Sequence, residues 1–201
     1  YTTLTRYNTG ETEPSSGGVA VEGGNLEYNA TTFNVGLRYN KWPVFKPFVS
    51  FSQSFSIADL GRTLRSATEN TVAQINSDAV IANNYEAGFN SRLGKTHFSG
   101  AYFISTSKFG ATYRELESGV FEIARQPERV YGFELALDTP LTDDLTFGGS
   151  VSYTEGKLDE EDNGNFDTYM NSDRIPPLKT VTYLSYNYNK KLNARVSYIY
   201  S

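Results

Sequence analysis

The sequence predicts an all-β protein, an antiparallel up-and-down meander of about nine strands like those of transmembrane β-barrels. Several segments alternate apolar and polar residues, most clearly over residues 33–40, 131–138 and 192–200. Successive side chains of a strand point to opposite faces, so this pattern gives each strand one apolar and one polar face. Short polar turns also alternate with long connections, as they do in membrane-spanning barrels. In addition, the 201 residues include 15 Tyr and 13 Phe, and Tyr favours membrane interfaces.

The first 83 residues predict three strands separated by two loops and a turn. Residues 8–25 are rich in Gly, Ser, Glu and Thr, a composition typical of loops. Val49, Phe51 and Phe55 alternate with serines, which indicates a strand with one apolar face. Residues 57–67 have the potential for a turn or two of helix. The predicted elements are the end of a strand at 1–7, a loop at 8–25, a strand at 26–39, a turn at 40–46, a strand at 47–55 and a loop at 56–83.

The remaining residues predict six strands in three hairpins. Gly94 marks the first tight turn, and Pro140 with Asp143 marks the second. Residues 119–124, inside a long loop, have the composition of an extension of the strand that follows. The predicted strands are 84–92, 97–109, 129–138, 145–153, 178–186 and 192–201, with turns at 93–96, 139–144 and 187–191 and loops at 110–128 and 154–177.

Sequential hairpins without crossovers predict a meander, and a meander has two open edges. Open edges are not viable in lipid, because unpaired backbone groups there are costly. Either the chain is therefore part of a larger closed barrel, or about eight of its strands close on themselves. The strand patterns that begin at Tyr1 and stop at Ser201 favour the larger barrel.

Composition excludes several classes of function. The chain has no Cys, which excludes disulfides, thiolate catalysis and Cys-based metal sites. Its net charge is −5 and no basic stripe is present, so we expect no nucleic-acid partner. His97 is the only histidine, which leaves too few groups for a Ser-His-Asp triad or a histidine metal site. We therefore expect neither an enzyme nor a bound cofactor.

The acidic run at residues 159–165 has part of the pattern of a calcium-binding loop. Asp159, Glu161 and Asn163 supply oxygen atoms at alternate positions, and Gly164 follows. The twelfth position is Met170, however, where such loops need a bidentate Glu. The run therefore predicts a solvated acidic loop.

Six short motifs occur in a defined order along the chain. They are FVSFSQSF at 48–55, ADLGRTLR at 58–65, NYEAGF at 84–89, YFISTS at 102–107, VYGFEL at 130–135 and RIPPLK at 174–179. Their order and spacing resemble the barrel of TonB-dependent outer-membrane receptors, especially the siderophore receptors, and the resemblance covers nearly the whole chain. Gly132 and Glu134 match inward positions of the family motif, and the alternation agrees, because it places them opposite Tyr131, Phe133 and Leu135.

The resemblance implies a 22-stranded barrel with an N-terminal plug, of which residues 1–201 would be a partial transmembrane β-barrel domain without the plug and the C-terminal strands. It also implies ligand binding and uptake of a ferric siderophore, or a related iron chelate, across the bacterial outer membrane, energised through TonB. The partners would be the chelate, outer-membrane lipid, and TonB acting through the plug. The lipid face would carry Val35, Leu37, Phe133, Leu135, Val151 and Val196.

Two alternatives belong to other classes. One is a small closed β-barrel or secreted β-domain that acts as an adhesin-like or structural binding module with Tyr-rich loops. In a sandwich of that kind the apolar rows would meet one another across two stacked sheets. The other is an enzyme within a small outer-membrane barrel, which lacks a convincing set of catalytic residues.

The candidate ligand-binding residues lie in the predicted long loops. Arg forks can grip carboxylate and hydroxamate-like oxygens. For the arginines of the second loop the alternative is a salt bridge to Asp59 or Glu69, and for Tyr169 it is packing on the barrel mouth. The candidates are Arg62 and Arg65, then Tyr113 and Arg114, then Tyr169 and Arg174.

Overall fold

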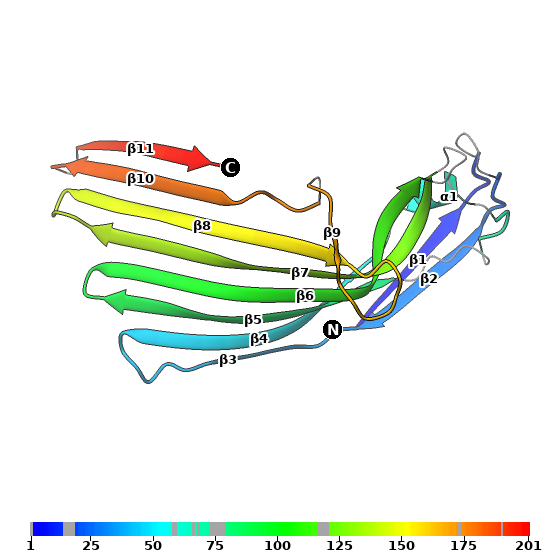
Figure 1. Ribbon diagram of the computed structural model, residues 1–201, viewed down its shortest axis with the longest axis horizontal. Coiled ribbons are helices and arrows are strands. Elements are labelled where there is room, and N and C mark those ends of the chain that lie inside the picture. Colours follow the sequence, from blue (N-terminus) through cyan, green and yellow to red (C-terminus); the bar gives the residue numbers. More distant parts are fainter. Residues whose placement is uncertain are drawn as a thin grey trace.

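The computed structural model is built almost entirely of antiparallel strands (Figure 1). It describes residues 2–13, 19–57, 60–65, 67, 69–72, 79–115, 121–172, 174–189 and 191–201, with backbone alone for 2–6, 62–63, 109–115 and 121–125. The elements are β1 (Thr2–Thr9), β2 (Gly24–Thr31), β3 (Asn34–Arg38), β4 (Phe45–Ser56), α1 (Leu60–Arg65), β5 (Val80–Leu93), β6 (Thr96–Glu115), β7 (Phe121–Pro140), β8 (Leu145–Leu158), β9 (Thr168–Tyr169), β10 (Lys179–Tyr188) and β11 (Leu192–Tyr200). Within these ranges no helix is long and apolar enough to cross a membrane.

The strands form a meander, which confirms the predicted fold class. Among the described residues the main sheet runs in the order β11-β10-β8-β7-β6-β5-β4-β3. The short β9 pairs with the last two residues of β8, and β1 pairs with β2 in a separate ribbon. The predicted strand at 26–39 is divided into β2 and β3, and β9 has only two residues. With β2 and β3 counted as the one predicted strand and the two-residue β9 left out, the described residues contain the nine strands that were predicted.

One length prediction was wrong. The segment 110–128 was expected to be a long loop, but β6 and β7 are 20 residues each and pair as far as Glu115 and Phe121. A register shift between Ser107 and Gly110 lets the ladder continue beyond an irregularity. The extension is rich in residues that favour strands, such as Thr112 and Ile123. Only the proposed strand character of 119–124 pointed this way, and it underestimated the extent.

The connections divide into two ends of the sheet (Figure 1). The turns after β3, β5, β7 and β10 lie at one end, called here the short-turn end, and the connections after β1, β4, β6 and β8 lie at the other, the long-loop end. Gly94, with φ of 61°, occupies a left-handed position in the turn after β5 that favours glycine.

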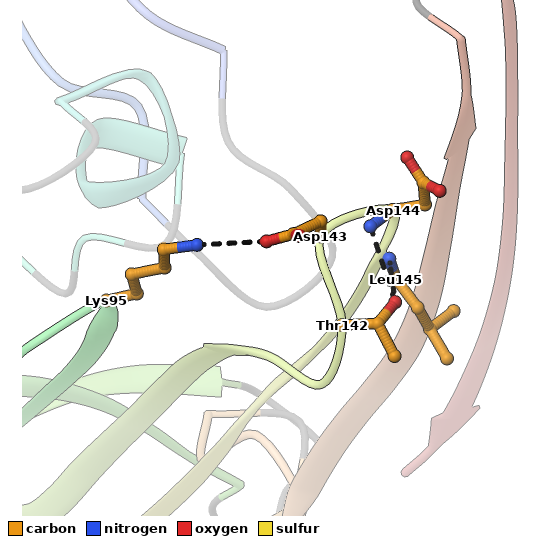
Figure 2. A network of polar contacts seen from close by, with 5 residues as sticks. All are labelled: Lys95, Thr142, Asp143, Asp144 and Leu145. Atoms are coloured by element: carbon orange, nitrogen blue, oxygen red, sulfur yellow. Dashed lines mark hydrogen bonds and ion pairs between the residues drawn. The ribbon is translucent and has the colours of Figure 1, made fainter.

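The turn after β7 is held by its own side chain and by a neighbouring turn (Figure 2). The Thr142 hydroxyl accepts hydrogen bonds from the backbone amides of Asp144, at 3.3 Å, and Leu145, at 3.0 Å. The Lys95 ammonium lies 3.1 Å from the Asp143 carboxylate, which links the turn after β5 to the turn after β7. Both ends of this ion pair are exposed, so it orients the turns more than it stabilises the fold.

The register places the apolar residues in rows across one face of the sheet. One row follows Leu37, Val49, Ala87, Tyr102 and Phe133 on successive strands. The exposed fractions of these side chains remain high, 73% for Leu37 and 48% for Tyr102. No second sheet covers this face among the described residues. The apolar rows therefore do not meet across a sandwich, as the secreted-domain alternative required.

The opposite face is polar and lined with small residues. Ser50, Ser52 and Glu86 lie on it, and the Ser50 hydroxyl donates to the Glu86 carboxylate at 3.4 Å. Aromatic rings on this face cover glycines of the next strand. A Cβ added at Gly88 would lie 2.7 Å from the Phe48 ring, so the residue there must lack a side chain.

Candidate functional site

The six candidate ligand-binding residues belong to elements at the long-loop end of the sheet (Figure 1). They fall into three groups, on α1, on the extension of β6, and in the connection between β8 and β10. Each group is positioned by a different set of contacts.

The first two long loops fold together into one small cap. The backbone amide of Val19 donates to the Ala67 carbonyl at 3.0 Å, and that of Glu22 donates to the Asn70 carbonyl at 2.9 Å. Four apolar side chains are buried between the loops. They are Val21, Leu64, Ala67 and Val72, with Leu26 of β2 packed against them. Burying the larger of these side chains, Val21, Leu64 and Val72, contributes about 1.5–3 kcal/mol each and helps to hold α1 in place.

The helix α1 carries Arg62 and Arg65, which confirms the expected short helical turn within 57–67. Leu64 is 5% exposed and points into the cap, whereas Arg65 is exposed. The side chain of Arg62 and all of Asp59 lie outside the described residues, so the suggested ion pair with Asp59 remains a prediction. The cap therefore holds Arg65, an exposed residue, on a structured base.

Tyr113 and Arg114 lie on the extension of β6 rather than in an irregular loop. Their backbones pair with Ile123 and Glu122 of β7. Their side chains lie outside the described residues, and their proposed role in ligand binding remains a prediction.

The connection between β8 and β10 folds back on the rim formed by β7 and β8. The amide of Met170 donates to the Gly156 carbonyl at 2.9 Å. The Arg174 guanidinium lies 2.6 Å from the Glu128 carboxylate, and the two side chains are 30% and 18% exposed. Arg174 thus fastens this connection to β7, a structural contact that its sequence position did not reveal.

Tyr169 lies on the other side of the same rim. The Lys157 ammonium sits over its ring at 4.7 Å from the centroid, and Arg129 lies over the Phe166 ring at 4.0 Å. Arg129 and Lys157 are opposite each other in the ladder and share the face of Tyr131 and Phe133. Glu128, and with it Arg174, belongs to the polar face. The structure therefore does not bring Tyr169 and Arg174 together.

The acidic run at 159–165 is only partly solvated, which corrects the expectation for its first residue. Asp159 is 2% exposed, and its carboxylate accepts hydrogen bonds from the amides of Asn163, at 3.0 Å, and Gly164, at 2.7 Å. Its oxygens are thus occupied by the backbone of the turn, while residues 160–165 are exposed. Nowhere in the described ranges do three or more His, Cys, Asp or Glu residues gather as a metal site would require.

The polar face also carries features that sequence reasoning missed. A hollow of about 450 Å³ lies over β4 to β10, and its lining includes small residues such as Ser99 and Ser150, the Phe48 ring, and the charged residues Glu134 and Lys179. Glu134 and Lys179 are both in register with Ser152, one on each side of it. The signal for this hollow was the run of small residues at alternate positions, such as Ser150 and Ser152. The hollow itself could not be predicted, because its lining comes from several strands whose pairing the sequence does not give.

Comparison with known proteins gives consistent results. The family model "TonB dependent receptor-like, beta-barrel" matches residues 2–201. Among solved structures, the copper transporter OprC superposes with a TM-score of 0.72 at 15% identity over 90% of this chain and 28% of its own. The ferric-catecholate import receptor Fiu from Escherichia coli K12 has a TM-score of 0.65 and 13% sequence identity, and the match covers 96% of this chain and 29% of Fiu. The FrpB iron transporter from Neisseria meningitidis, in its apoprotein form, has a TM-score of 0.65 and 16% sequence identity, and the match covers 98% of this chain and 29% of FrpB. The chain thus spans under a third of these proteins' lengths.

Proposed function

Because the chain belongs to the family of TonB-dependent receptors, we propose that it forms part of the barrel through which a receptor takes up a ferric siderophore, or a related iron chelate. In this proposal residues 1–201 are a partial barrel domain, completed in the whole receptor by further strands and a plug. TonB would supply the energy through that plug.

Family membership confirms two of the expectations from the sequence. TonB-dependent receptors are outer-membrane β-barrel proteins of bacteria, so the chain is an outer-membrane protein. They are receptors for transport rather than enzymes, in agreement with the absence of a catalytic set.

The uncovered apolar face is the observation that carries the proposal. Val35, Leu37 and Val196 are 68%, 73% and 76% exposed, which soluble proteins avoid over so large a continuous surface. In a barrel this face would meet lipid, and the polar face would line the interior. At the short-turn end, Tyr39, Trp42 and Phe45 form a contiguous aromatic row, as membrane interfaces favour.

The long-loop end supports the assignment of ligand binding to that side. The structured cap holds Arg65 exposed, and a ferric chelate usually presents oxygen atoms that a guanidinium can bind. Two of the compared structures are described as iron or ferric-catecholate transporters, and a third as a copper transporter. Iron chelates are therefore the first ligand class to examine, with copper as the comparison.

Growth of a strain lacking the full-length receptor gene tests the proposal directly. We expect loss of growth on one ferric siderophore in a panel of hydroxamate, catecholate and citrate chelates, and rescue by the receptor. Rescue should fail when TonB is also absent. Normal growth on every iron source, with altered copper accumulation instead, would contradict uptake of an iron chelate.

The arginines of α1 give a sharper test within the same receptor. Replacing Arg62 and Arg65 by Ala should weaken binding of that chelate about 10–100-fold, since a hydrogen bond to a charged group contributes about 1.5–3 kcal/mol. Replacement of Lys95 by Ala, at the opposite end of the sheet, is the matched control. Equal affinities for both variants would exclude α1 from the binding site.

A further inference from the structure

Asn163 and Gly164 form the only Asn-Gly pair in the sequence. They lie in the connection between β8 and β10, in the exposed part of the turn that Asp159 begins. In such a pair the backbone nitrogen of Gly can attack the side-chain carbonyl carbon of Asn, because Gly carries no side chain that obstructs the approach. The pair is therefore a site at which Asn163 can be deamidated without an enzyme.

The reaction requires no co-reactant other than water. The Gly164 nitrogen loses its proton and forms a bond to Cγ of Asn163, and the side-chain nitrogen leaves with that proton as ammonia. Water then opens the resulting succinimide ring at either of its two carbonyl carbons. The products are aspartate and isoaspartate, and isoaspartate adds a methylene group to the backbone.

The folded turn restrains the nucleophile of this reaction. The Gly164 amide donates a hydrogen bond of 2.7 Å to one carboxylate oxygen of Asp159, and the Asn163 amide donates to the other at 3.0 Å. Asp159 is 2% exposed, so water competes little for these oxygens. A hydrogen bond to a charged acceptor is stronger than a neutral one, and the adjacent negative charge opposes removal of the amide proton.

The electrophile, the side chain of Asn163, is restrained as well. Its Nδ2 donates to the Glu161 carboxylate at 2.9 Å, and its Oδ1 accepts from the backbone amide of Asn165 at 2.8 Å. Attack requires the carboxamide to turn its face toward the Gly164 nitrogen, which these contacts resist. Both contacts are exposed to water, so they are weaker restraints than the contact with buried Asp159.

The base of the turn is fixed to the neighbouring strand. The backbone amide of Asp159 donates to the Pro127 carbonyl at 3.0 Å, which fastens the start of the turn to β7. The turn then passes through left-handed backbone at Asp162, with φ of 51°, and Gly164, with φ of 87°. The Asp159 carboxylate thus meets the Gly164 amide from a fixed position.

We propose that Asn163 is a site of spontaneous deamidation, and that Asp159 is the positioning residue that slows the reaction while the turn is closed. Reaction then proceeds from turns in which the Asp159 contact has opened. The added methylene group of isoaspartate would displace the Gly164 amide from Asp159, so an opened turn that reacts could not close again. The modification also adds one negative charge to the connection.

Timed incubation of the full-length receptor at neutral pH tests the proposal. Trypsin cleaves after Lys157 and Arg174, so residues 158–174 are released as one peptide, in which mass spectrometry locates the modified residue. We expect Asn163 in the receptor to react at least about tenfold more slowly than in a synthetic peptide of residues 158–174. The reason is that opening must first break a hydrogen bond to a charged group.

Replacement of Asp159 by Asn isolates the role of the carboxylate, because the side chain keeps its size and loses its charge. Deamidation of Asn163 should become several-fold faster in Asp159→Asn. The matched control is Glu160→Gln, which removes one negative charge from an exposed side chain of the same turn and should leave the rate unchanged. Asn171, in the same tryptic peptide, should keep its rate in both variants.

Three results would overturn the proposal. They are equal rates in the receptor and the peptide, equal rates in Asp159→Asn and Glu160→Gln, and parallel acceleration of Asn163 and Asn171, which would assign the effect to loosening of the whole connection. If Asp159→Asn does not fold, hydrogen exchange of the Gly164 amide in the unaltered receptor decides, and exchange as fast as in the peptide counts against Asp159. The inference uses only contacts within the turn, so its failure leaves the growth tests of iron uptake unaffected.

Discussion

Two tyrosine side chains lie where the apolar face of β7 and β8 ends, on the side of the long loops. Toward the long-loop end the apolar rows finish at Tyr131 and Tyr153, whose hydroxyls both donate to the Glu155 carboxylate, the second at 2.7 Å. Lys157 lies 3.7 Å from the same carboxylate. A ring that is apolar at its base and polar at its tip suits the boundary between hydrocarbon and water.

Leu135 lies well inside this limit, 39% exposed on the apolar face. Leu135→Arg in the full-length receptor should make folding into bilayers less favourable by about 2–4 kcal/mol, because the charge would enter hydrocarbon. Denaturant titration in lipid vesicles measures this. Ser50→Arg, on the polar face beside Glu86, is the control and should change stability much less. Equal effects of the two substitutions would show that the apolar face does not meet lipid.

Trp42 tests the other boundary, since it is the only tryptophan of the chain. Its ring lies 4.8 Å from that of Tyr39 and 6.1 Å from that of Phe45. Subtracting the emission of the Trp42→Phe variant from that of the full-length receptor gives the emission of Trp42 alone. We expect lipids brominated near the headgroup to quench this emission more than lipids brominated near the chain end. A difference signal insensitive to brominated lipids would place Trp42 in water.

At the scale of elements, the connection between β8 and β10 behaves as a docked segment. Asp159 organises its first turn, Met170 and Ile175 cover Gly156, and Arg174 pairs with Glu128. The pair of Arg174 and Glu128 joins residues 46 positions apart and fastens the connection to β7. A segment held in this way is expected to open less readily than an unsupported loop.

Removing the Glu128 carboxylate should release the end of this segment. Glu128→Ala would remove the ion pair with Arg174, at a cost of about 1 kcal/mol to the docked state, because this pair is only partly shielded from water. Hydrogen exchange should accelerate across 170–177 in the full-length receptor. Asp143→Ala, which removes the exposed Lys95 pair, is the control and should leave exchange in 170–177 unchanged. Unaltered exchange in Glu128→Ala would show that the ion pair does not hold the segment.

At the scale of the whole molecule, the sheet has two structurally different ends. The loops that carry the candidate ligand residues lie at the long-loop end (Figure 1). Arg38, Lys46, Arg92 and His97 line a small hollow beside the turns of the other end. In outer-membrane barrels long loops face the outside and short turns face the periplasm. The proposed orientation therefore places ligand capture outside the cell and the short turns toward the periplasm.

Single-cysteine labelling tests this orientation, because the chain has no Cys of its own. In a full-length receptor without other cysteines, Glu160→Cys should react with a membrane-impermeant maleimide on intact cells. Lys95→Cys should react only after the outer membrane is permeabilised. Both positions are exposed, so accessibility differs through the membrane alone. The reverse pattern would invert the proposed orientation.

The sequence by itself determined the strands, their two faces and the order of turns and loops. These features are local, because side-chain alternation and turn residues act over a few positions, and the alternation of 131–138 led directly to the correct faces. Only the tertiary structure decided where β6 and β7 end, that Arg174 pairs with Glu128, and that Arg38, Lys46, Arg92 and His97 meet. Each of these depends on register between strands, which backbone hydrogen bonds fix between residues far apart in the chain.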